Sequence, residues 1–297
     1  MGKNERVIVT ASDENYVWTC LNLLESLGKW ARIAYVIDLG LTAESRQAFE
    51  SRCAGVIDIP DHAWKSLDAA TTYAGAMTIR PQLPQLFAHD YIMWIDADCW
   101  VQNRAALALY FDMAQANDRN FVLAAELDAE YPHCVDAFDV RQEKLRDLHS
   151  QLWDVAVAEE LHGKALLNSG LFAASRSSPV WQEFDKRVKE QYLGNPRVRE
   201  DTRLAHMAEQ QSLHRVLHET QLFTVMTADF NWVCHAGPLV RRGFFVETPN
   251  LRRRPHIVHL TMLGSLEESY RENFLLYESR RDRLARFVLQ RFSRRAE

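Results

Sequence analysis

Two aspartates separated by one residue, Asp96 and Asp98, directly follow an apolar run at residues 91–95. Side chains alternate along extended backbone, so carboxylates at positions i and i+2 point to the same side and repel each other unless a cation lies between them. Hard divalent cations such as Mg²⁺ and Mn²⁺ prefer oxygen ligands and also bind phosphate oxygens. The spacing therefore predicts a metal site that binds a phosphate-containing ligand, although two solvated loop acids would give the same pattern.

The segments around these aspartates predict a parallel sheet. Apolar runs at residues 6–10, 33–39 and 55–60 alternate with stretches in which apolar residues have helical spacing. This alternation indicates an α/β fold with a mostly parallel, Rossmann-type sheet and helices on both of its faces. Ligands bind at the carboxyl ends of the strands in such sheets, and Asp96 and Asp98 fall at such an end.

The second half of the sequence is less regular, and we expect a mixed region there that belongs to the same domain. The helices that we expect span residues 14–30, 42–52, 104–117, 139–163, 179–192 and 201–218, and a further helix begins at Pro81. The later strands are expected at residues 121–125, at 165–174, where Asn-Ser-Gly interrupts an apolar run, within 221–233 and at 256–260.

The composition is that of an ordinary globular protein of 297 residues, with 47% hydrophobic and 25% charged residues. The net charge of −5 gives no reason to expect nucleic-acid binding. The five cysteines include no Cys-x-x-Cys pair, which argues against a disulfide framework or a zinc site and suits a reducing cytoplasm. We find no signal peptide and no apolar run long enough to cross a bilayer, so we expect a cytoplasmic protein.

Several motifs occur in an order that resembles the family 8 glycosyltransferases, which include glycogenin and bacterial lipopolysaccharide galactosyl- and glucosyltransferases. The resemblance covers roughly residues 5–262. The motifs that carry it are residues 10–16 (TASDENY), Arg80, Asp96-Ala97-Asp98, Asn168-Ser169-Gly170, Glu209-Gln210 and the terminal strand that ends in His259.

The resemblance implies a GT-A-like catalytic domain over residues 1–262, with a nucleotide-binding half (1–126) and a half for the donor sugar and the acceptor (127–262). It also implies a UDP-sugar donor, a hexose such as galactose or glucose, and transfer with retention of anomeric configuration. The residues that it assigns to the donor are Thr10, Ala11, Asp13, Asn15, Tyr16, Arg80, Asp96, Ala97, Asp98, Asn168, Ser169, Gly170, Glu209 and Gln210.

The same resemblance implies that Asp96, Asp98 and His259 hold the Mn²⁺ or Mg²⁺ ion together with the donor's diphosphate. Gln210 is a weak nucleophile, so we expect it to position the anomeric carbon and the acceptor rather than to form a covalent intermediate. The candidate carboxylates on the acceptor side are Glu126 and Asp128.

The motifs also have structural explanations. Asp13 and Asn15 could cap a helix, Arg80 could be an exposed residue at a helix start, and a histidine in a strand such as His259 is more often a core residue. The segment after His259 has no lysine to hold a diphosphate. The arginines that could replace it are Arg241, Arg242 and those at 252–254.

Two other functions fit part of the pattern. A haloacid dehalogenase-type phosphohydrolase would use Asp96 as its nucleophile, but its Asp-x-Asp normally opens the chain and here follows three expected strands. A module that binds a nucleotide sugar without transferring it would fit the missing lysine.

Residues 263–297 predict a basic helical tail, because the segment from Arg271 onward contains eight arginines and only four acidic residues. Its apolar residues have helical spacing, which predicts an interfacial helix and peripheral contact with the inner face of a membrane. A final helix packed on the domain would show the same spacing. The apolar residues are Leu284, Phe287, Val288 and Phe292.

The sequence does not identify the acceptor. The acceptor classes that we consider are a saccharide, a lipid-linked molecule and a protein.

Overall fold

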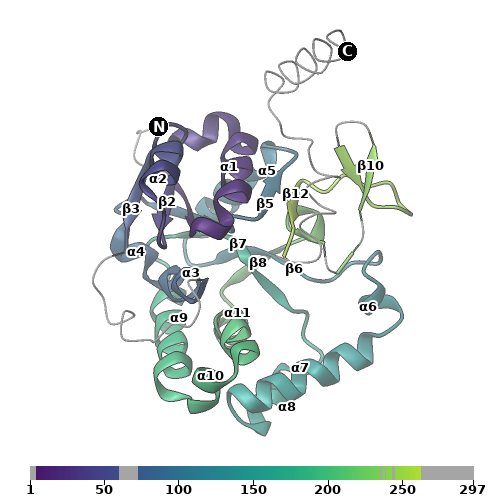
Figure 1. Ribbon diagram of the computed structural model, residues 1–297. Helices are drawn as coiled ribbons and strands as arrows, with labels where there is room; N and C mark the ends of the chain where they lie inside the picture. Colours follow the sequence, from purple (N-terminus) through teal and green to yellow (C-terminus); the bar gives the residue numbers. More distant parts are fainter. Residues whose placement is uncertain (1–4, 60–72, 235, 238, 243–244, 262–297) are drawn as a thin grey trace, which may run out of the picture.

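The computed structural model describes residues 5–59, 73–234, 236–237, 239–242 and 245–261. Its centre is a seven-stranded sheet that lies between layers of helices (Figure 1). The strands, in order across the sheet, are β3 (Gly55–Asp58), β2 (Ala34–Asp38), β1 (Arg6–Ser12), β4 (Tyr91–Ile95), β7 (Leu167–Ser175), β6 (Phe121–Ala125) and β8 (Phe223–Met226).

The sheet is mostly parallel, as the sequence predicts. Strands β3, β2, β1 and β4 run in the same direction, and β8 is parallel to β6. Strand β7 is antiparallel to both of its neighbours, β4 and β6. Because β7 starts where β4 ends, the polar residues at its start lie beside the Asp-x-Asp motif, and the Asp96 N–H donates to the Gly170 carbonyl at 2.8 Å.

The two faces of the sheet bury separate apolar cores. Val7 and Val9 pack into one core and Ile8 into the other, because side chains alternate along a strand. Burial on both faces explains why the strands are continuous apolar runs in the sequence. One face is covered by α1 (Val17–Leu27), α2 (Ala43–Glu50) and α5 (Ala105–Ala116), and the other by α3 (Tyr73–Ile79), α4 (Leu83–Leu86), α9 (Val180–Lys189) and α11 (Thr202–Thr220).

A small three-stranded sheet brings the end of the described chain back to the residues that follow β4. It contains β5 (Cys99–Val101), β12 (Ile257–His259) and β9 (Trp232–Val233). Strand β12 is antiparallel to β5 and parallel to β9, and His259 lies opposite Cys99. The strand expected at 256–260 is therefore confirmed. The nearby strands β10 (Val240–Arg242) and β11 (Phe245–Glu247) form an antiparallel pair.

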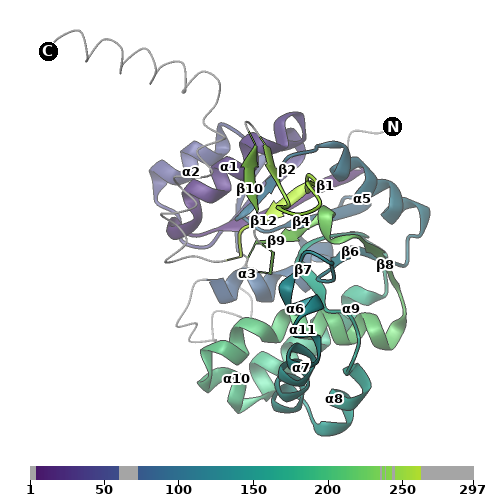
Figure 2. The ribbon, with the colours of Figure 1, turned by 90° about the vertical axis from the view of Figure 1, so that its right-hand side faces the viewer.

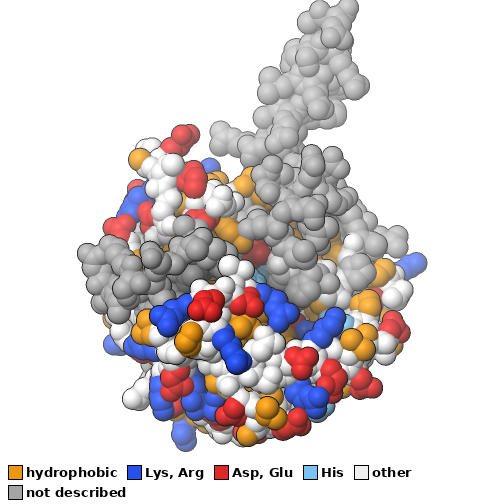
Figure 3. All heavy atoms as spheres, turned by 60° about the horizontal axis from the view of Figure 1, so that its bottom comes forward, with side chains coloured by type: hydrophobic (Ala, Val, Ile, Leu, Met, Phe, Trp, Pro, Cys, Tyr) orange, Lys and Arg blue, Asp and Glu red, His pale blue; other side chains and the backbone are white. Residues whose placement is uncertain are grey.

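The long helix expected over residues 139–163 is two helices, α7 (Phe138–Leu152) and α8 (Val155–Leu161). The Asp154 carboxylate accepts the Val157 N–H at 2.9 Å and caps α8, so the chain starts a new helix there. Helix α7 lies beside α10 (Pro196–Glu200) and α8 packs on α7, on the side of the sheet away from α1 and α2 (Figure 2). Acidic and basic side chains are interspersed on this face (Figure 3). The short α6 (Pro132–Val135) precedes α7.

Instead of a helix that begins at Pro81, the structure has two short helices joined by a turn that contains Pro81. Helix α3 ends at Ile79, a 3₁₀ turn covers Arg80–Gln82, and α4 begins at Leu83. Pro81 has no N–H to continue the α-helical hydrogen bonds, so the chain tightens at this point. Arg80 therefore sits at a buried junction rather than at an exposed helix start.

Strand β7 is continuous, although the sequence suggests that Asn-Ser-Gly interrupts it. The irregularity falls instead on its neighbour β6, where the register shifts between Leu123 and Ala125. No helix in the described residues is long and apolar enough to cross a membrane. The basic tail, residues 263–297, lies outside the described residues.

A stack of buried histidines joins α7 to α11. The rings of His149 and His214 are stacked with centroids 5.8 Å apart, and His214 Nδ1 accepts the Leu167 N–H at 3.4 Å. Burial lowers the pKa of His149 and holds the pKa of His214 well below its usual range. The unfolded chain therefore binds more protons than the folded one below pH ~6.5.

We expect stability to fall as the pH drops below ~6.5, by up to ~1.4 kcal/mol per pH unit for each histidine, and to be constant in this respect at higher pH. Urea unfolding at pH 7.5 and 5.5 measures the loss. His214→Gln, which keeps an acceptor for Leu167, should reduce the pH dependence. An equal loss in this variant would contradict the assignment to His214.

Candidate active site

A cleft of about 670 Å³ lies at the carboxyl ends of β1 and β4. This is the edge at which parallel α/β sheets bind their ligands, and the volume is in the range of small-molecule sites. Side chains from the ends of both strands, from the start of β7 and from α7 and α11 line the cleft. They include most of the residues that the sequence assigns to a donor: Ala11, Asp13, Tyr16, Arg80, Asp96, Ala97, Asp98, Asn168, Ser169, Gly170, Glu209 and Gln210.

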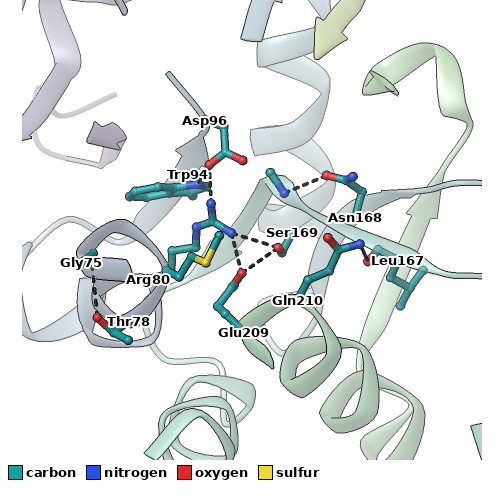
Figure 4. A network of polar contacts seen from close by, with 12 residues as sticks. Gly75, Thr78, Arg80, Trp94, Asp96, Leu167, Asn168, Ser169, Glu209 and Gln210 are labelled. Atoms are coloured by element: carbon teal, nitrogen blue, oxygen red, sulfur yellow. Dashed lines mark hydrogen bonds and ion pairs between the residues drawn. The ribbon is translucent and has the colours of Figure 1, made fainter. Parts of the chain in front are cut away.

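Asp96 is held from two sides (Figure 4). The Trp94 indole N–H donates to Asp96 Oδ1 at 2.7 Å, which the shared side of residues i and i+2 makes possible. Arg80 donates to the same oxygen at 2.5 Å and lies over the Trp94 ring, with Cζ 4.9 Å from its centroid. Asp96 Oδ2 remains free of these two donors. Burial raises the pKa of Asp96, although Arg80 and His259 act against this.

Arg80 connects the half-buried carboxylate of Asp96 to the buried carboxylate of Glu209. Its guanidinium donates to Asp96 on one side and to Glu209 Oε2 on the other, at 2.6 Å, and the side chain is only 5% exposed. Ser169 Oγ accepts from Arg80 and donates to Glu209, both at 2.9 Å. The guanidinium at the α3–α4 junction thus contacts residues from three other elements: the end of β4, β7 and α11.

Glu209 is 1% exposed, and burial raises its pKa to about 7 although Arg80 lies beside it. Its second oxygen, Oε1, is buried and has no hydrogen-bond partner in the described part of the chain. A buried carboxylate oxygen without a donor is costly, and it lies at the wall of the cleft. A ligand hydroxyl would satisfy it.

His259 reaches Asp96 and Asp98 from β12. Its Nε2 lies 3.3 Å from Asp98 Oδ1 and 3.5 Å from Asp96 Oδ2. Neighbouring ligands of an octahedral cation with bonds of about 2.1 Å lie about 3 Å apart, so these atoms fit around one Mg²⁺ or Mn²⁺ ion. His256, the residue before β12, contacts Asn103 through Nδ1 at 3.0 Å, so the two histidines point to different places.

Asp98 and His259 each stabilise the charged form of the other. Burial acts to raise the pKa of Asp98, but His259 and the Thr261 N–H outweigh it, and the pKa of Asp98 lies below its usual range. Burial acts to lower the pKa of His259, and Asp98 reverses this, so the His259 pKa is raised. A protonated His259 and a divalent cation therefore meet the same need for positive charge next to Asp98.

Gly170 leaves the space that this arrangement requires. A Cβ atom there would lie 2.2 Å from His259 Cε1 and 2.7 Å from Asp96 Oδ2. Both distances are shorter than a non-bonded contact allows. The glycine inside β7, which weakens the strand, is thus explained by the close approach of His259 and Asp96.

A second polar network lies on the other side of the Asn-Ser-Gly segment. Glu126 Oε1 accepts from the Asn168 amide at 2.8 Å and from the Gln210 amide at 3.1 Å, and Arg141 contacts Glu126 Oε2 at 2.5 Å. Asn231 donates to Asn168 Oδ1 at 2.8 Å. The structure thus unites Glu126 and Gln210 at the cleft. Arg141 also lines it and was missed, because nothing in its charged helix distinguishes it from solvated neighbours.

Three residues that the sequence analysis selects do not line the cleft formed by the described residues: Thr10, Asn15 and Asp128. Asp128 pairs with Arg253 and accepts the Glu130 N–H at 2.8 Å, so it lies in a separate cluster. Arg254 pairs with Glu247, so these two arginines already have acidic partners. Asp13 accepts the backbone N–H groups of Asn15 and Tyr16, which confirms its capping role beside its place in the cleft.

Removing Arg80 should destabilise the protein, because the buried Glu209 and the half-buried Asp96 would be left without their shared cation. We expect Arg80→Ala to cost about 3–5 kcal/mol at pH 8 and less below pH ~7, where Glu209 binds a proton and needs no counter-charge. Urea unfolding at pH 8 and 5.5 measures both effects. Arg146→Ala, on the surface beside Glu143 and Glu159, is the control. Equal losses in the two variants would show that Arg80 is an ordinary surface residue.

Gly170→Ala should displace His259 and Asp96. We expect a loss of stability of about 1–3 kcal/mol, the usual cost of overpacking, and weaker Mn²⁺ binding measured by electron paramagnetic resonance. Gly194→Ala is the matched control, because no atom lies within 4 Å of its added Cβ. Unchanged Mn²⁺ binding in Gly170→Ala would argue against a metal at this place.

Comparison with known proteins connects this geometry to a fold. No protein-family model matches the chain, and no curated protein is similar to it in sequence. Among solved structures it is similar to mouse xyloside xylosyltransferase 1 in its apo form, with 14% sequence identity and a TM-score of 0.50. The match covers 86% of this chain and 97% of the mouse chain. The chain therefore has a GT-A-like glycosyltransferase fold, as the sequence predicts.

Proposed function

We propose that the protein is a metal-dependent glycosyltransferase that moves a hexose from a UDP-sugar to an acceptor hydroxyl with retention of configuration. The observation that carries this proposal is the convergence of Asp96, Asp98 and His259 at the ligand-binding edge of a GT-A-like sheet. Similarity in fold to a xylosyltransferase supports sugar transfer as the class of reaction. The UDP nucleotide, the hexose and retention rest on the resemblance to family 8.

The donor would lie along the cleft from β1 to β7. Ala11, Asp13 and Tyr16 line the end of the cleft next to β1 and would contact the nucleotide. Asp96, Asp98 and His259 would hold Mn²⁺ or Mg²⁺, which supplies positive charge to the leaving diphosphate when it is bound. Arg253 and Arg254 are engaged with acidic side chains, so we propose that the metal site supplies this charge.

The transferred sugar would lie next to Arg80, Ser169 and Glu209. Glu209 Oε1 offers an acceptor to a sugar hydroxyl, and the Arg80 and Ser169 contacts fix its orientation. In the transfer, the acceptor oxygen bonds to the anomeric carbon, and the carbon–oxygen bond to the diphosphate breaks with its electron pair on the diphosphate. The acceptor's proton leaves with the departing phosphate oxygen.

The acceptor hydroxyl would approach from the network of Glu126, Gln210 and Arg141. The Gln210 amide is fixed by Glu126 and by the Leu167 carbonyl, at 3.1 and 3.3 Å, so it is a positioning group rather than a nucleophile. Asp128 points into another cluster and is no longer proposed as an acceptor-side group. A saccharide, a lipid-linked molecule and a protein remain the acceptor classes to test.

A panel of UDP-sugars with Mn²⁺ tests the proposal by release of UDP, with and without added saccharide acceptors. Turnover of a UDP-sugar that stops in excess EDTA supports it. Hydrolysis of phosphate esters with a trapped aspartyl-phosphate on Asp96 would instead support the phosphohydrolase. That outcome has little structural support, because Asp96 Oδ1 already accepts from Arg80 and Trp94. UDP binding without any UDP release would indicate a binding module.

Asp98→Asn and His259→Ala should each lower kcat for UDP release at least about 100-fold, the size of effect found for groups that stabilise developing charge. His256→Ala is the matched control, from the residue just before β12, and should retain activity, because its ring contacts Asn103 outside the cleft. Equal losses in the two histidine variants would show that the strand, rather than the ligand, is important.

A further inference from the structure

Cys99 lies beside the same two ligands. It is the residue opposite His259 in the antiparallel pair of β5 and β12, so the two side chains share one side of the small sheet. A ligand atom of Asp98, the Cys99 sulfur and a ring nitrogen of His259 all lie within 4.8 Å of one another. The three residues are 9%, 2% and 5% exposed. Oxygen, sulfur and nitrogen donors thus converge in a buried place.

The contacts of this group leave ligand positions available. His259 Nδ1 is buried and has no hydrogen-bond partner in the described residues, while Nε2 faces the two carboxylates. Asp98 Oδ2 accepts the Thr261 N–H, and Oδ1 faces His259. Asp96 is the most committed of the acids, because its Oδ1 already accepts from Arg80 and Trp94.

Simple packing does not require a thiol at this position. Cys99 joins the apolar core that contains Ile95 and Val101, where an aliphatic side chain would fill the same volume. A cation between Asp98 and His259 would place its positive charge beside this sulfur.

We propose that Cys99 is a ligand of the cation site and that the site binds Zn²⁺ more tightly than Mg²⁺. This rests on the proposed metal site of the transferase and adds a ligand to it. Zinc takes sulfur at about 2.3 Å, nitrogen at about 2.0–2.1 Å and oxygen at about 2.0–2.2 Å in tetrahedral sites, so its ligand atoms lie about 3.5 Å apart. The three donor atoms here all lie within 4.8 Å of one another. The thiol proton passes to solvent when the sulfur binds the metal.

The fourth tetrahedral position of such a site would face the cleft. Asp98 and His259 belong to the cleft wall, whereas Cys99 lies behind them in the core. A diphosphate oxygen could therefore complete the coordination from the open side. Soft sulfur favours zinc over magnesium, and the cysteine thus sets which cation the site selects. The wide spacing of the cysteines in the sequence gives no sign of this, because the three ligands come from two distant segments.

Cadmium is the probe for the thiolate, because Cd²⁺ bound to sulfur has a charge-transfer absorption in the ultraviolet. We expect this band when Cd²⁺ is added to the wild-type protein without nucleotide, and its loss in Cys99→Ser. Cys53→Ser is the control, because Cys53 is a partly exposed thiol that contacts the Gly55 carbonyl instead. A band that persists in Cys99→Ser, or no band in the wild type, overturns the proposal.

Zinc affinity gives the second measurement. Competition with a chromophoric chelator should show Zn²⁺ binding at least about ten-fold weaker in Cys99→Ser, with Mg²⁺ binding nearly unchanged. If Cys99→Ser does not fold, X-ray absorption of the zinc-loaded wild type decides the question: a sulfur neighbour at about 2.3 Å supports the proposal, and a shell of only nitrogen and oxygen overturns it. These results are independent of transfer. Mn²⁺-dependent UDP release without a cadmium band would support the transferase and contradict the cysteine ligand. A cadmium band without UDP release would support the cysteine ligand and contradict the transferase.

Discussion

The buried guanidinium of Arg80 is the interaction on which the rest of the site depends. Asp96 and Glu209 approach the same buried region from the end of β4 and from α11, and neither could remain ionised there without a shared cation. The Arg80 fork binds both and so fixes the position of α11 against the sheet. Because Arg80 uses Asp96 Oδ1, it leaves Asp96 Oδ2, Asp98 and His259 as the acidic and imidazole groups that face the proposed metal position. Asp96 Oδ1 and Glu209 thus belong to a structural ion pair with Arg80, while Asp96 Oδ2, Asp98 and His259 remain available to a ligand.

Close approach is the second constraint. The small sheet brings β12 against β5, and His259 then reaches the Asp-x-Asp motif only because Gly170 has no side chain. Asn168 and Ser169, on either side of the same peptide segment, turn to different partners: Ser169 joins Arg80 and Glu209, and Asn168 joins Glu126 and Asn231. A polar triplet inside an apolar strand thus connects two networks. The first network surrounds the place proposed for the donor sugar, and the second surrounds the place proposed for the acceptor.

Glu209 Oε1 is a buried polar atom at the cleft wall that has no hydrogen-bond partner in the described residues. The pKa of Glu209 is raised to about 7, because the effect of burial outweighs that of the neighbouring Arg80. Unsatisfied groups of this kind in a cleft are where ligand hydroxyls bind, and this is the physical basis for placing a sugar there.

The sequence by itself determined the strands of the sheet, its parallel character and the position of Asp96 and Asp98, because these depend on local apolar patterning and on the alternation of side chains. The motif order also identified Arg80, the Asn-Ser-Gly segment, Glu209 and His259, but not how they touch. Only the tertiary structure decided that Arg80 is buried between two acids, that Arg141 joins Glu126 and that Asp128 turns away to Arg253. It also decided that Cys99 faces His259, since a pairing between segments 160 positions apart depends on the register of β5 and β12 and leaves no trace in the local sequence.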